Sequence, residues 1–165
     1  MCPTPPPPDP APHDAAPTDA SPAIDNSFLE SLIGYNARRA AIAVIGMLLG
    51  RMAPFGLRVV DFSVLTLIAH NPGITSRQLC ATLAILPPNL VGMIRQLESR
   101  GLIEKRRQLK DKRAQGLYTT AEGARLQAAA QQVVASVETE TITRLSEDDR
   151  QTLIRLLRKV YQGDA

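Results

Sequence analysis

Four interruptions divide the middle of this chain into short helical segments, while the sequence on either side is predicted to form long helices. Each interruption contains proline or glycine, the residues that most often end or begin a helix. They fall at Pro54-Phe55-Gly56, Asn71-Pro72-Gly73, Pro87-Pro88 and Gly101. Apolar residues recur at helical spacing between them, which predicts helices over about 59–70, 75–84 and 87–100.

The flanking regions contain start signals for longer helices. A capping box at Ser27-Phe28-Leu29-Glu30 predicts one helix from residue 27 to about residue 52, roughly 35–40 Å long. Thr120 is expected to cap a second long helix, and Ser146 a final one. These amphipathic helices have no partner inside a body this small, so we expect their apolar stripes to pack against a second copy of the chain. The alternative is a monomer in which they pack on one another.

The first 26 residues differ in composition from the rest. They hold nine of the thirteen prolines, four aspartates and no lysine or arginine. Such a segment buries too little apolar surface to offset its ordering entropy, so we expect a solvated, polyproline-like tail. Binding to a proline-recognition module is the alternative. The tail carries a charge of −4 and residues 27–165 carry +7, so the net charge of +3 conceals a basic folded part.

The basic charge is concentrated in residues 77–113, which carry nine basic and three acidic side chains. Two short strand patterns, 102–107 and 117–120, flank a polar loop from Gln108 to Gly116 and predict a basic β-hairpin. Two short helices joined by a turn and followed by a hairpin form a winged helix-turn-helix. The predicted fold class is therefore mainly α with a minor β part. A basic patch of this kind is typical of proteins that bind a phosphate backbone, although a solvated charged face has the same composition.

Residues 57–123 resemble the multiple-antibiotic-resistance regulator family, MarR. Four motifs in this order and spacing carry the resemblance: Val64-Leu65; Ile74-Thr75-Ser76-Arg77-Gln78-Leu79; Gln96-Leu97-Glu98-Ser99-Arg100-Gly101-Leu102-Ile103; and Asp111-Lys112-Arg113-Ala114 with Thr120-Ala121-Glu122-Gly123. With the flanking helices, the resemblance covers about residues 28–162. It implies dimerisation helices over about 27–52 and 121–162, and a winged helix-turn-helix over about 57–120.

The function that this resemblance implies is a sequence-specific transcription regulator, a ligand-responsive repressor that acts as a homodimer on a pseudo-palindromic operator in double-stranded DNA. The alternatives are a winged-helix module that binds a protein and a non-specific architectural DNA binder. The sequence contains no Ser-His-Asp arrangement, phosphate-binding glycine loop or paired-carboxylate motif, so we expect no enzymatic activity and no cofactor. Two distant histidines without a Cys/His/Asp cluster argue against a metal site. With no apolar run long enough to cross a membrane and no signal-peptide pattern, we expect a soluble, cytoplasmic protein.

The resemblance also assigns DNA-binding residues. By family position, Pro88, Asn89, Gly92 and Met93 lie near base edges and phosphates, with Arg95 beside them. Asn89 suits adenine, but it is also a plausible first-turn residue that stabilises the helix start. Many relatives have a basic or polar side chain in place of Gly92. The expected phosphate contacts are Ser76, Arg77, Lys105, Arg106, Arg107, Lys110 and Lys112.

Two further sites follow from the resemblance. Arg113 resembles the arginine that enters the minor groove from the wing, and Asp111 would orient it; a solvated charge pair is the alternative. Family members often bind small aromatic or lipophilic anions between the dimer helices and the winged lobe. The corresponding pocket residues here are Tyr35, Arg38, Arg39, Met47 and Phe62, where the two arginines are equally suited to the surface or to dimer contacts.

Overall fold

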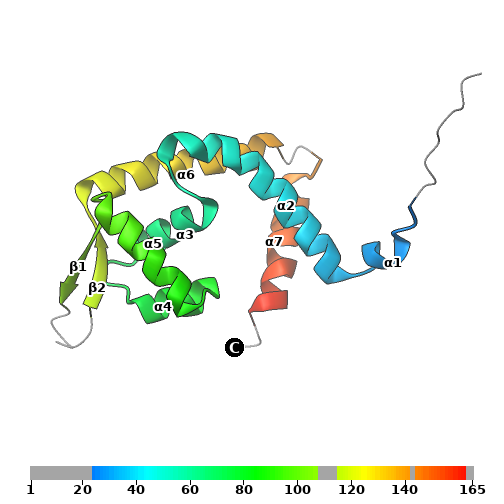
Figure 1. Cartoon of the computed structure of the whole chain (residues 1–165). Coiled ribbons are helices and arrows are strands. Elements are labelled where there is room, and N and C mark those ends of the chain that lie inside the picture. The colour runs from blue at the N-terminus through cyan, green and yellow to red at the C-terminus, as the bar shows by residue number, and fades with distance from the viewer. Residues whose placement is uncertain (1–23, 108–114, 142–143, 163–165) are drawn as a thin grey trace, which may run out of the picture. The chain divides into compact units, whose positions relative to one another are not determined.

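The computed structural model describes residues 24–107, 115–141 and 144–162. Along the chain these residues form seven α-helices, one 3-10 helix and a two-stranded sheet (Figure 1). The elements are α1 (Ser27–Glu30), α2 (Ile33–Met52), η1 (Ala53–Phe55), α3 (Val59–His70), α4 (Ser76–Leu83), α5 (Pro87–Ser99), β1 (Ile103–Arg107), β2 (Gln115–Thr119), α6 (Ala121–Thr141) and α7 (Glu147–Tyr161). Residues up to Asn36 form one compact unit and the rest form a second. The expected mainly α fold with a small β part is confirmed.

The prediction of one continuous helix from residue 27 to residue 52 is wrong. The helix stops after Glu30 and restarts at Ile33, and Ser27 does not cap it. Side chains that bind backbone carbonyls explain the break. The Ser31 hydroxyl donates to the Phe28 carbonyl at 2.7 Å, and the Asn36 amide donates to the carbonyls of Glu30 and Leu32 at 2.7 and 2.8 Å. The bonds to Phe28 and Glu30 satisfy carbonyl groups that a continuous helix would use internally, whereas the Leu32 carbonyl also accepts the Asn36 backbone N–H at 3.2 Å.

A single hydrophobic core joins α2, α3, α4, α5, the sheet and α6, and α7 contributes no residue to it. Helix α3 lies at its centre and packs against α4, α5, α6 and β2. Val64, Leu65 and Ile68 of α3 are completely buried, as is Leu79 of α4. Leu90, Ile94 and Leu97 anchor α5 to the same core. The three short helices predicted between the chain's interruptions are therefore confirmed and form one packed group.

Three helices begin with a side-chain cap, and those at Thr120 and Ser146 confirm the prediction. The Thr75 hydroxyl accepts a hydrogen bond from the Gln78 backbone at 3.3 Å, and the Thr120 hydroxyl accepts one from the Gly123 backbone at 3.0 Å. The Ser146 hydroxyl accepts from the Asp149 backbone at 3.1 Å and donates to the Asp149 carboxylate at 2.6 Å. Hydrogen bonding to Ser146 lowers the pKa of Asp149. Hydrogen bonds from Arg150 and then Gln151 lower the pKa of Glu147 to about 2.

The antiparallel sheet is tied to the turn between α3 and α4. Ile103 pairs with Thr119 at one end of the sheet, and Arg107 pairs with Gln115 at the other. An additional bridge joins Leu117 to Ile74, and the Gly73 backbone donates to the Leu117 carbonyl at 2.8 Å. Strand β2 begins two residues earlier than predicted, because Gln115 and Gly116 pair with β1 instead of belonging to the loop. The connection between the strands, residues 108–114, lies outside the described residues.

The end of α5, the start of β1 and the start of α6 meet at one place. The Thr120 hydroxyl donates to the Gly101 carbonyl at 2.6 Å, and the Thr120 backbone donates to the Leu102 carbonyl at 3.1 Å. Gly101 has a φ of +67°, a left-handed conformation that favours glycine and turns the chain from α5 into β1. At Gly123 a Cβ would lie only 1.8 Å from the Leu102 carbonyl oxygen. This close packing fixes the hairpin relative to α5 and α6.

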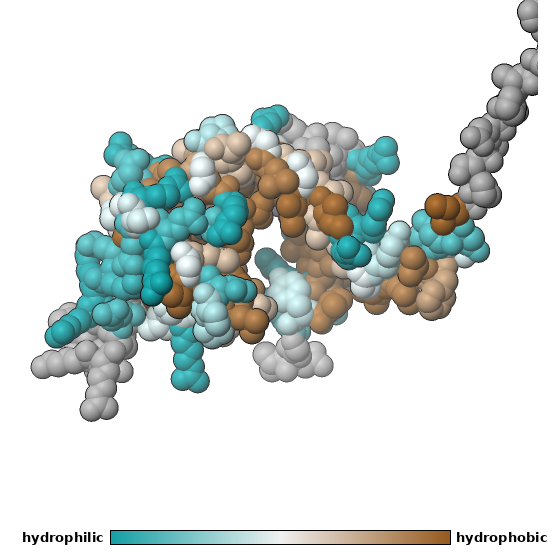
Figure 2. All heavy atoms as spheres, in the orientation of Figure 1, coloured by the Kyte–Doolittle hydropathy of each residue, from teal (hydrophilic) through white to brown (hydrophobic). Residues whose placement is uncertain are grey.

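Helices α2 and α7 expose much of their apolar surface (Figure 2). No residue of α7 is buried, and Leu153, Leu156 and Val160 are 43%, 48% and 66% exposed. Ile42 and Leu49 of α2 are 56% and 57% exposed. In the described part of the chain, no single helix has the length and apolar character of a membrane span, although the bent pair formed by 33–55 and 59–70 passes that test together.

Candidate nucleic-acid interface

Helix α5 has one face in the core and one face in solvent. Leu90, Ile94 and Leu97 are 1%, 4% and 1% exposed, which fixes the helix in the fold. Asn89 and Gly92 lie on the opposite side and are exposed. The separation into two stripes follows from the spacing of the apolar residues and confirms the prediction. An exposed polar helix face held by a rigid core is suited to insertion into a groove.

A hollow of about 570 Å³ lies along this exposed face. It is lined by Arg58, Pro88, Asn89, Gly92, Met93 and Gln96. Four of these residues were predicted DNA contacts, and all four are on α5. Arg58 is the residue immediately before α3, so the hollow combines the face of α5 with a cation from another element.

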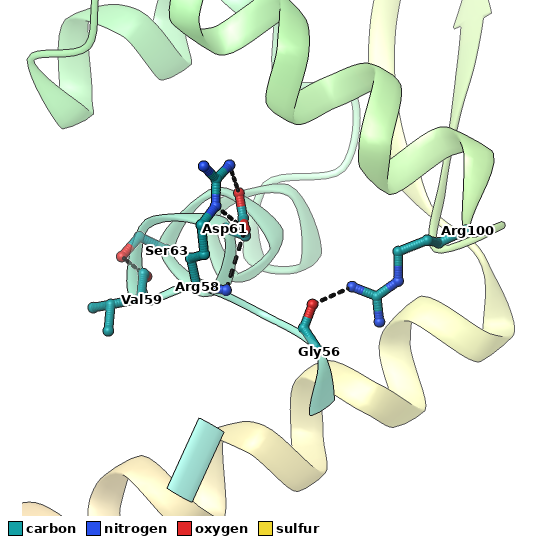
Figure 3. Close-up of polar contacts among 6 residues, drawn as sticks. All are labelled: Gly56, Arg58, Val59, Asp61, Ser63 and Arg100. Atoms are coloured by element: carbon teal, nitrogen blue, oxygen red, sulfur yellow. Dashed lines mark hydrogen bonds and ion pairs between the residues drawn. The ribbon is translucent and has the colours of Figure 1, made fainter. Parts of the chain in front are cut away.

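The Arg58 side chain is held by a buried carboxylate (Figure 3). Its Nε and Nη2 atoms donate to Asp61 at 2.8 and 2.9 Å, and the Arg58 backbone donates to the same carboxylate at 3.1 Å. The Asp61 side chain is 3% exposed, whereas the Arg58 side chain is 63% exposed. These hydrogen bonds and the charge of Asp61 raise the pKa of Arg58 above its ordinary value. The positive end of this ion pair therefore faces solvent.

A second arginine connects the end of α5 to the segment that follows α2. The Nη1 atom of Arg100 donates to the Gly56 carbonyl at 2.7 Å (Figure 3). Its Nη2 atom donates to the Phe55 carbonyl at 2.8 Å. Gly56 has a φ of +58°, so its left-handed backbone sets the direction of the carbonyl groups that Arg100 reaches. The position of α5 is therefore tied to the segment leading out of α2.

The basic side chains of β1 have different surroundings. Lys105 Nζ lies 2.6 Å from a Glu98 carboxylate oxygen, so this lysine joins the hairpin to α5. Arg106 forms an ion pair with Glu104 and lies over the ring of Tyr118, 4.9 Å from its centroid. Arg107 is exposed at the end of the strand.

The other predicted DNA contacts do not line the α5 hollow, or they fall outside the residues that the structure describes. Ser76 and Arg77 are exposed on α4 and line a smaller hollow of about 270 Å³ with Cys80, Pro87, Leu90 and Val91. Arg95 is exposed on α5 and lines neither hollow. Lys110, Asp111, Lys112 and Arg113 fall outside the described residues.

The predicted effector-pocket residues line neither of these hollows. Tyr35, Met47 and Phe62 are half-buried, and Arg38 and Arg39 are exposed. Met47 and Phe62 pack against the hydrophobic core. None of the five residues lines a described hollow, so the predicted ligand pocket stays a prediction.

Sequence reasoning missed Arg58 and Arg100 as parts of this region. Arg58 occupies the position before a helix where Ser, Thr, Asp or Asn is usual, and Asp61 follows three residues later. That unusual combination was a usable local signal. Arg100 lies 44 residues from Gly56 in the sequence, so no local pattern indicates their contact.

The arrangement defines a class of protein. Helices α3, α4 and α5 followed by the β1–β2 hairpin form a winged helix-turn-helix, with α5 in the position of the recognition helix and the hairpin as the wing. The MarR family model matches residues 55–114, which span α3, α4, α5 and β1. The chain belongs to the MarR family, as the resemblance of its motifs indicated.

Known relatives support this assignment. The transcriptional regulator HosA of Escherichia coli O157:H7 is 32% identical over 100 residues, which cover 61% of this chain and 74% of HosA. The transcriptional repressor CouR, solved bound to a 23-mer DNA duplex, is 34% identical with a TM-score of 0.78, covering 84% of this chain and 98% of CouR. A CouR structure bound to p-coumaroyl-CoA is 33% identical with a TM-score of 0.76, covering 86% and 100% of the two chains.

Proposed function

We propose that this chain is a sequence-specific DNA-binding transcription regulator, a repressor that a small ligand releases from a pseudo-palindromic operator. The observation that carries the proposal is the exposed polar face of α5, held in place by Leu90, Ile94 and Leu97. The solved CouR–DNA complex of a relative with 34% identity supports it.

In this proposal α5 enters the major groove. Asn89 is exposed near the start of the helix, and its amide can donate to and accept from adenine. A Cβ at Gly92 would meet no atom within 4 Å, so the fold itself does not require glycine at this position. Glycine there allows close approach of the α5 backbone to DNA, which supports Gly92 as part of the interface.

The β1–β2 hairpin is the proposed wing. The connection between Arg107 and Gln115 contains Lys110, Asp111, Lys112 and Arg113. We assign Arg113 to the minor groove, where a narrow groove concentrates negative potential. Ser76, Arg77, Lys105 and Arg107 are assigned to backbone phosphates, although the Glu98 ion pair makes Lys105 the weakest of these assignments.

We also propose that the functional unit is a homodimer formed through α2, α6 and α7. Exposed leucine and valine side chains along α7 would be costly to leave in water. A second copy would cover them and would also supply a second α5 for the other half of the operator.

The proposal is one of binding and involves no catalysis. HosA and CouR are both named as regulators of transcription. A regulator of this kind acts where the chromosome is, so we place the chain in the cytoplasm.

Substitution of Asn89 by alanine is expected to change which base is preferred, with a loss of discrimination of about 1–3 kcal/mol at one position of each half-site.

Arg113→Ala is expected to weaken binding and to relax the preference for a narrow minor groove. The measurement is selection of bound fragments from the source genome, followed by affinity measurements on the selected duplex for each variant.

Arg125→Ala, on the exposed surface of α6, is the matched control and is expected to leave the selected sequence unchanged. If Asn89→Ala and Arg113→Ala both retain the footprint and base preference of the unmodified chain, the assignment of α5 and the wing to DNA is wrong.

We further propose that the ligand is an aromatic carboxylic acid or its coenzyme A thioester. The CouR complex with p-coumaroyl-CoA supports this class, and Tyr35, Arg38, Arg39, Met47 and Phe62 supply aromatic, apolar and cationic side chains of the kind it needs. Their arrangement into a pocket is part of the proposal.

Titration of the protein–DNA complex with p-coumaroyl-CoA or salicylate is expected to reduce DNA affinity by about 5–150-fold, the usual range of coupling between two sites. Fluorescence anisotropy of a labelled duplex measures the release, and titration calorimetry of the free protein measures binding. Arg38→Ala and Arg39→Ala should weaken ligand binding while DNA affinity without ligand is kept. The absence of both heat and DNA release with either compound contradicts this ligand class.

A further inference from the structure

Arg58 is the cation that lines the α5 hollow, and the buried Asp61 carboxylate holds it in a defined orientation. It lies across the hollow from Asn89, Gly92 and Gln96, the exposed residues of α5. The hollow therefore opens on the same side as the face of α5 that is assigned to DNA. A group that occupies this hollow beside α5 would face the Arg58 guanidinium.

The guanidinium retains unused hydrogen-bonding capacity. An arginine side chain has five N–H donors, and two of the Arg58 donors are directed at Asp61. No other side-chain hydrogen bond of Arg58 is described within the residues that the structure covers. Its remaining donors are therefore available to a ligand with acceptor oxygens.

The start of α3 does not depend on the Arg58 side chain alone. The backbone N–H of Arg58 at the start of α3 donates to the Asp61 carboxylate at 3.1 Å. Any residue except proline at position 58 could make this hydrogen bond. The guanidinium end of the pair is 63% exposed and open to solvent, while the buried Asp61 carboxylate, 3% exposed, has Arg58 as its charged partner. The buried carboxylate fixes the direction of the exposed guanidinium.

We propose that Arg58 binds a backbone phosphate of the DNA strand that borders the groove occupied by α5. A guanidinium matches the planar arrangement of phosphate oxygens and can form two parallel hydrogen bonds to it. Asp61 is the positioning residue for this contact. A phosphate contact fixes the register of α5 on DNA and carries no base information itself. This inference rests on the proposed insertion of α5 into the major groove.

The test uses the full chain with Arg58→Ala, measured by fluorescence anisotropy on a selected duplex and on a mixed-sequence duplex between about 50 and 200 mM salt. Both affinities are expected to fall by the same factor, and the slope of log affinity against log salt should decrease by about one per protomer. Arg58→Lys should retain most of the slope, because it keeps the charge. Asp61→Asn should keep the slope near that of the unmodified chain but lower the affinity, because the charge stays and its orientation is lost.

Arg125→Ala is the control, since Arg125 on α6 is another exposed arginine paired with a carboxylate three residues away, in this case the exposed Glu122. It should leave the salt slope unchanged. Arg58→Gln serves as a second variant if Arg58→Ala does not fold, because it removes the charge and keeps a donor for Asp61. Thermal unfolding of each variant establishes that it is folded.

An unchanged salt slope for both Arg58→Ala and Arg58→Gln overturns the inference, as does an equal loss of slope in Arg125→Ala. A change in base preference in Arg58→Ala also overturns it, because it would assign Arg58 to a base. If the unmodified chain binds neither duplex, the proposed function itself fails. If it binds and Asn89→Ala changes base preference while Arg58→Ala has no effect, only the phosphate contact fails.

Discussion

Substitution of Gly123 by alanine is expected to lower the free energy of unfolding by about 3 kcal/mol or more, at the upper end of the usual range for overpacking. The new Cβ would lie 1.8 Å from the Leu102 carbonyl oxygen and 2.8 Å from its carbon. Both are backbone atoms, and the same oxygen accepts a hydrogen bond from Thr120. The clash is relieved only if the start of α6 separates from the start of β1, which also displaces the hairpin.

Denaturant unfolding followed by circular dichroism measures this effect. Gly92→Ala is the control, because a Cβ at Gly92 would meet no atom within 4 Å. In an exposed helix it is expected to raise the free energy of unfolding by up to about 1 kcal/mol. Equal stability changes in the two variants would show that the packing at Gly123 is looser than described.

Leu97→Ala is the second substitution with a large expected effect, a loss of about 2–5 kcal/mol. Leu97 is 1% exposed and lies in the core beneath α5. Alanine removes buried apolar surface and leaves a cavity under the helix assigned to DNA. We expect reduced affinity for the selected duplex in addition to reduced stability, since α5 would no longer be held in one position.

Val91→Ala is the matched control on the same helix. Val91 is 46% exposed, so its truncation should change the free energy of unfolding by about 0.5 kcal/mol at most. Denaturant unfolding and anisotropy are measured on both variants. A loss in Leu97→Ala no greater than that in Val91→Ala would contradict the described burial of this face.

Local chemistry explains which parts of the fold were predictable from the sequence. Thr75, Thr120 and Ser146 each place a hydroxyl within reach of a backbone N–H three residues later, so their caps depend on neighbouring residues alone. The break after Glu30 was missed because it depends on a side-chain hydrogen bond that the apolar pattern does not indicate. The Asn36 side-chain amide donates to the Glu30 carbonyl across the break, and the spacing of apolar residues cannot predict that hydrogen bond.

The candidate site was predictable only along α5. The spacing of Leu90, Ile94 and Leu97 determines which face is exposed, so the position of Asn89 followed from the sequence. The position of Arg58 near that helix depends on how α3 packs against α5, and the contact of Arg100 with Gly56 depends on how the end of α2 packs against it. Those contacts join residues far apart in the chain, and periodicity within one helix cannot predict them.

The hydrogen bonds from Arg100 to Phe55 and Gly56 tie the end of α5 to the segment that leads out of α2. A ligand that moves this segment changes the free energy with which α5 binds DNA. By thermodynamic linkage, DNA binding changes the free energy of ligand binding by the same amount. Operator DNA then lowers the affinity for that ligand by the same factor by which the ligand lowers the affinity for the operator. Half-saturation of the protein on its operator therefore requires more ligand than half-saturation of the free protein. The ligand concentration that gives half-saturation thus depends on the fraction of the protein that is bound to operator DNA.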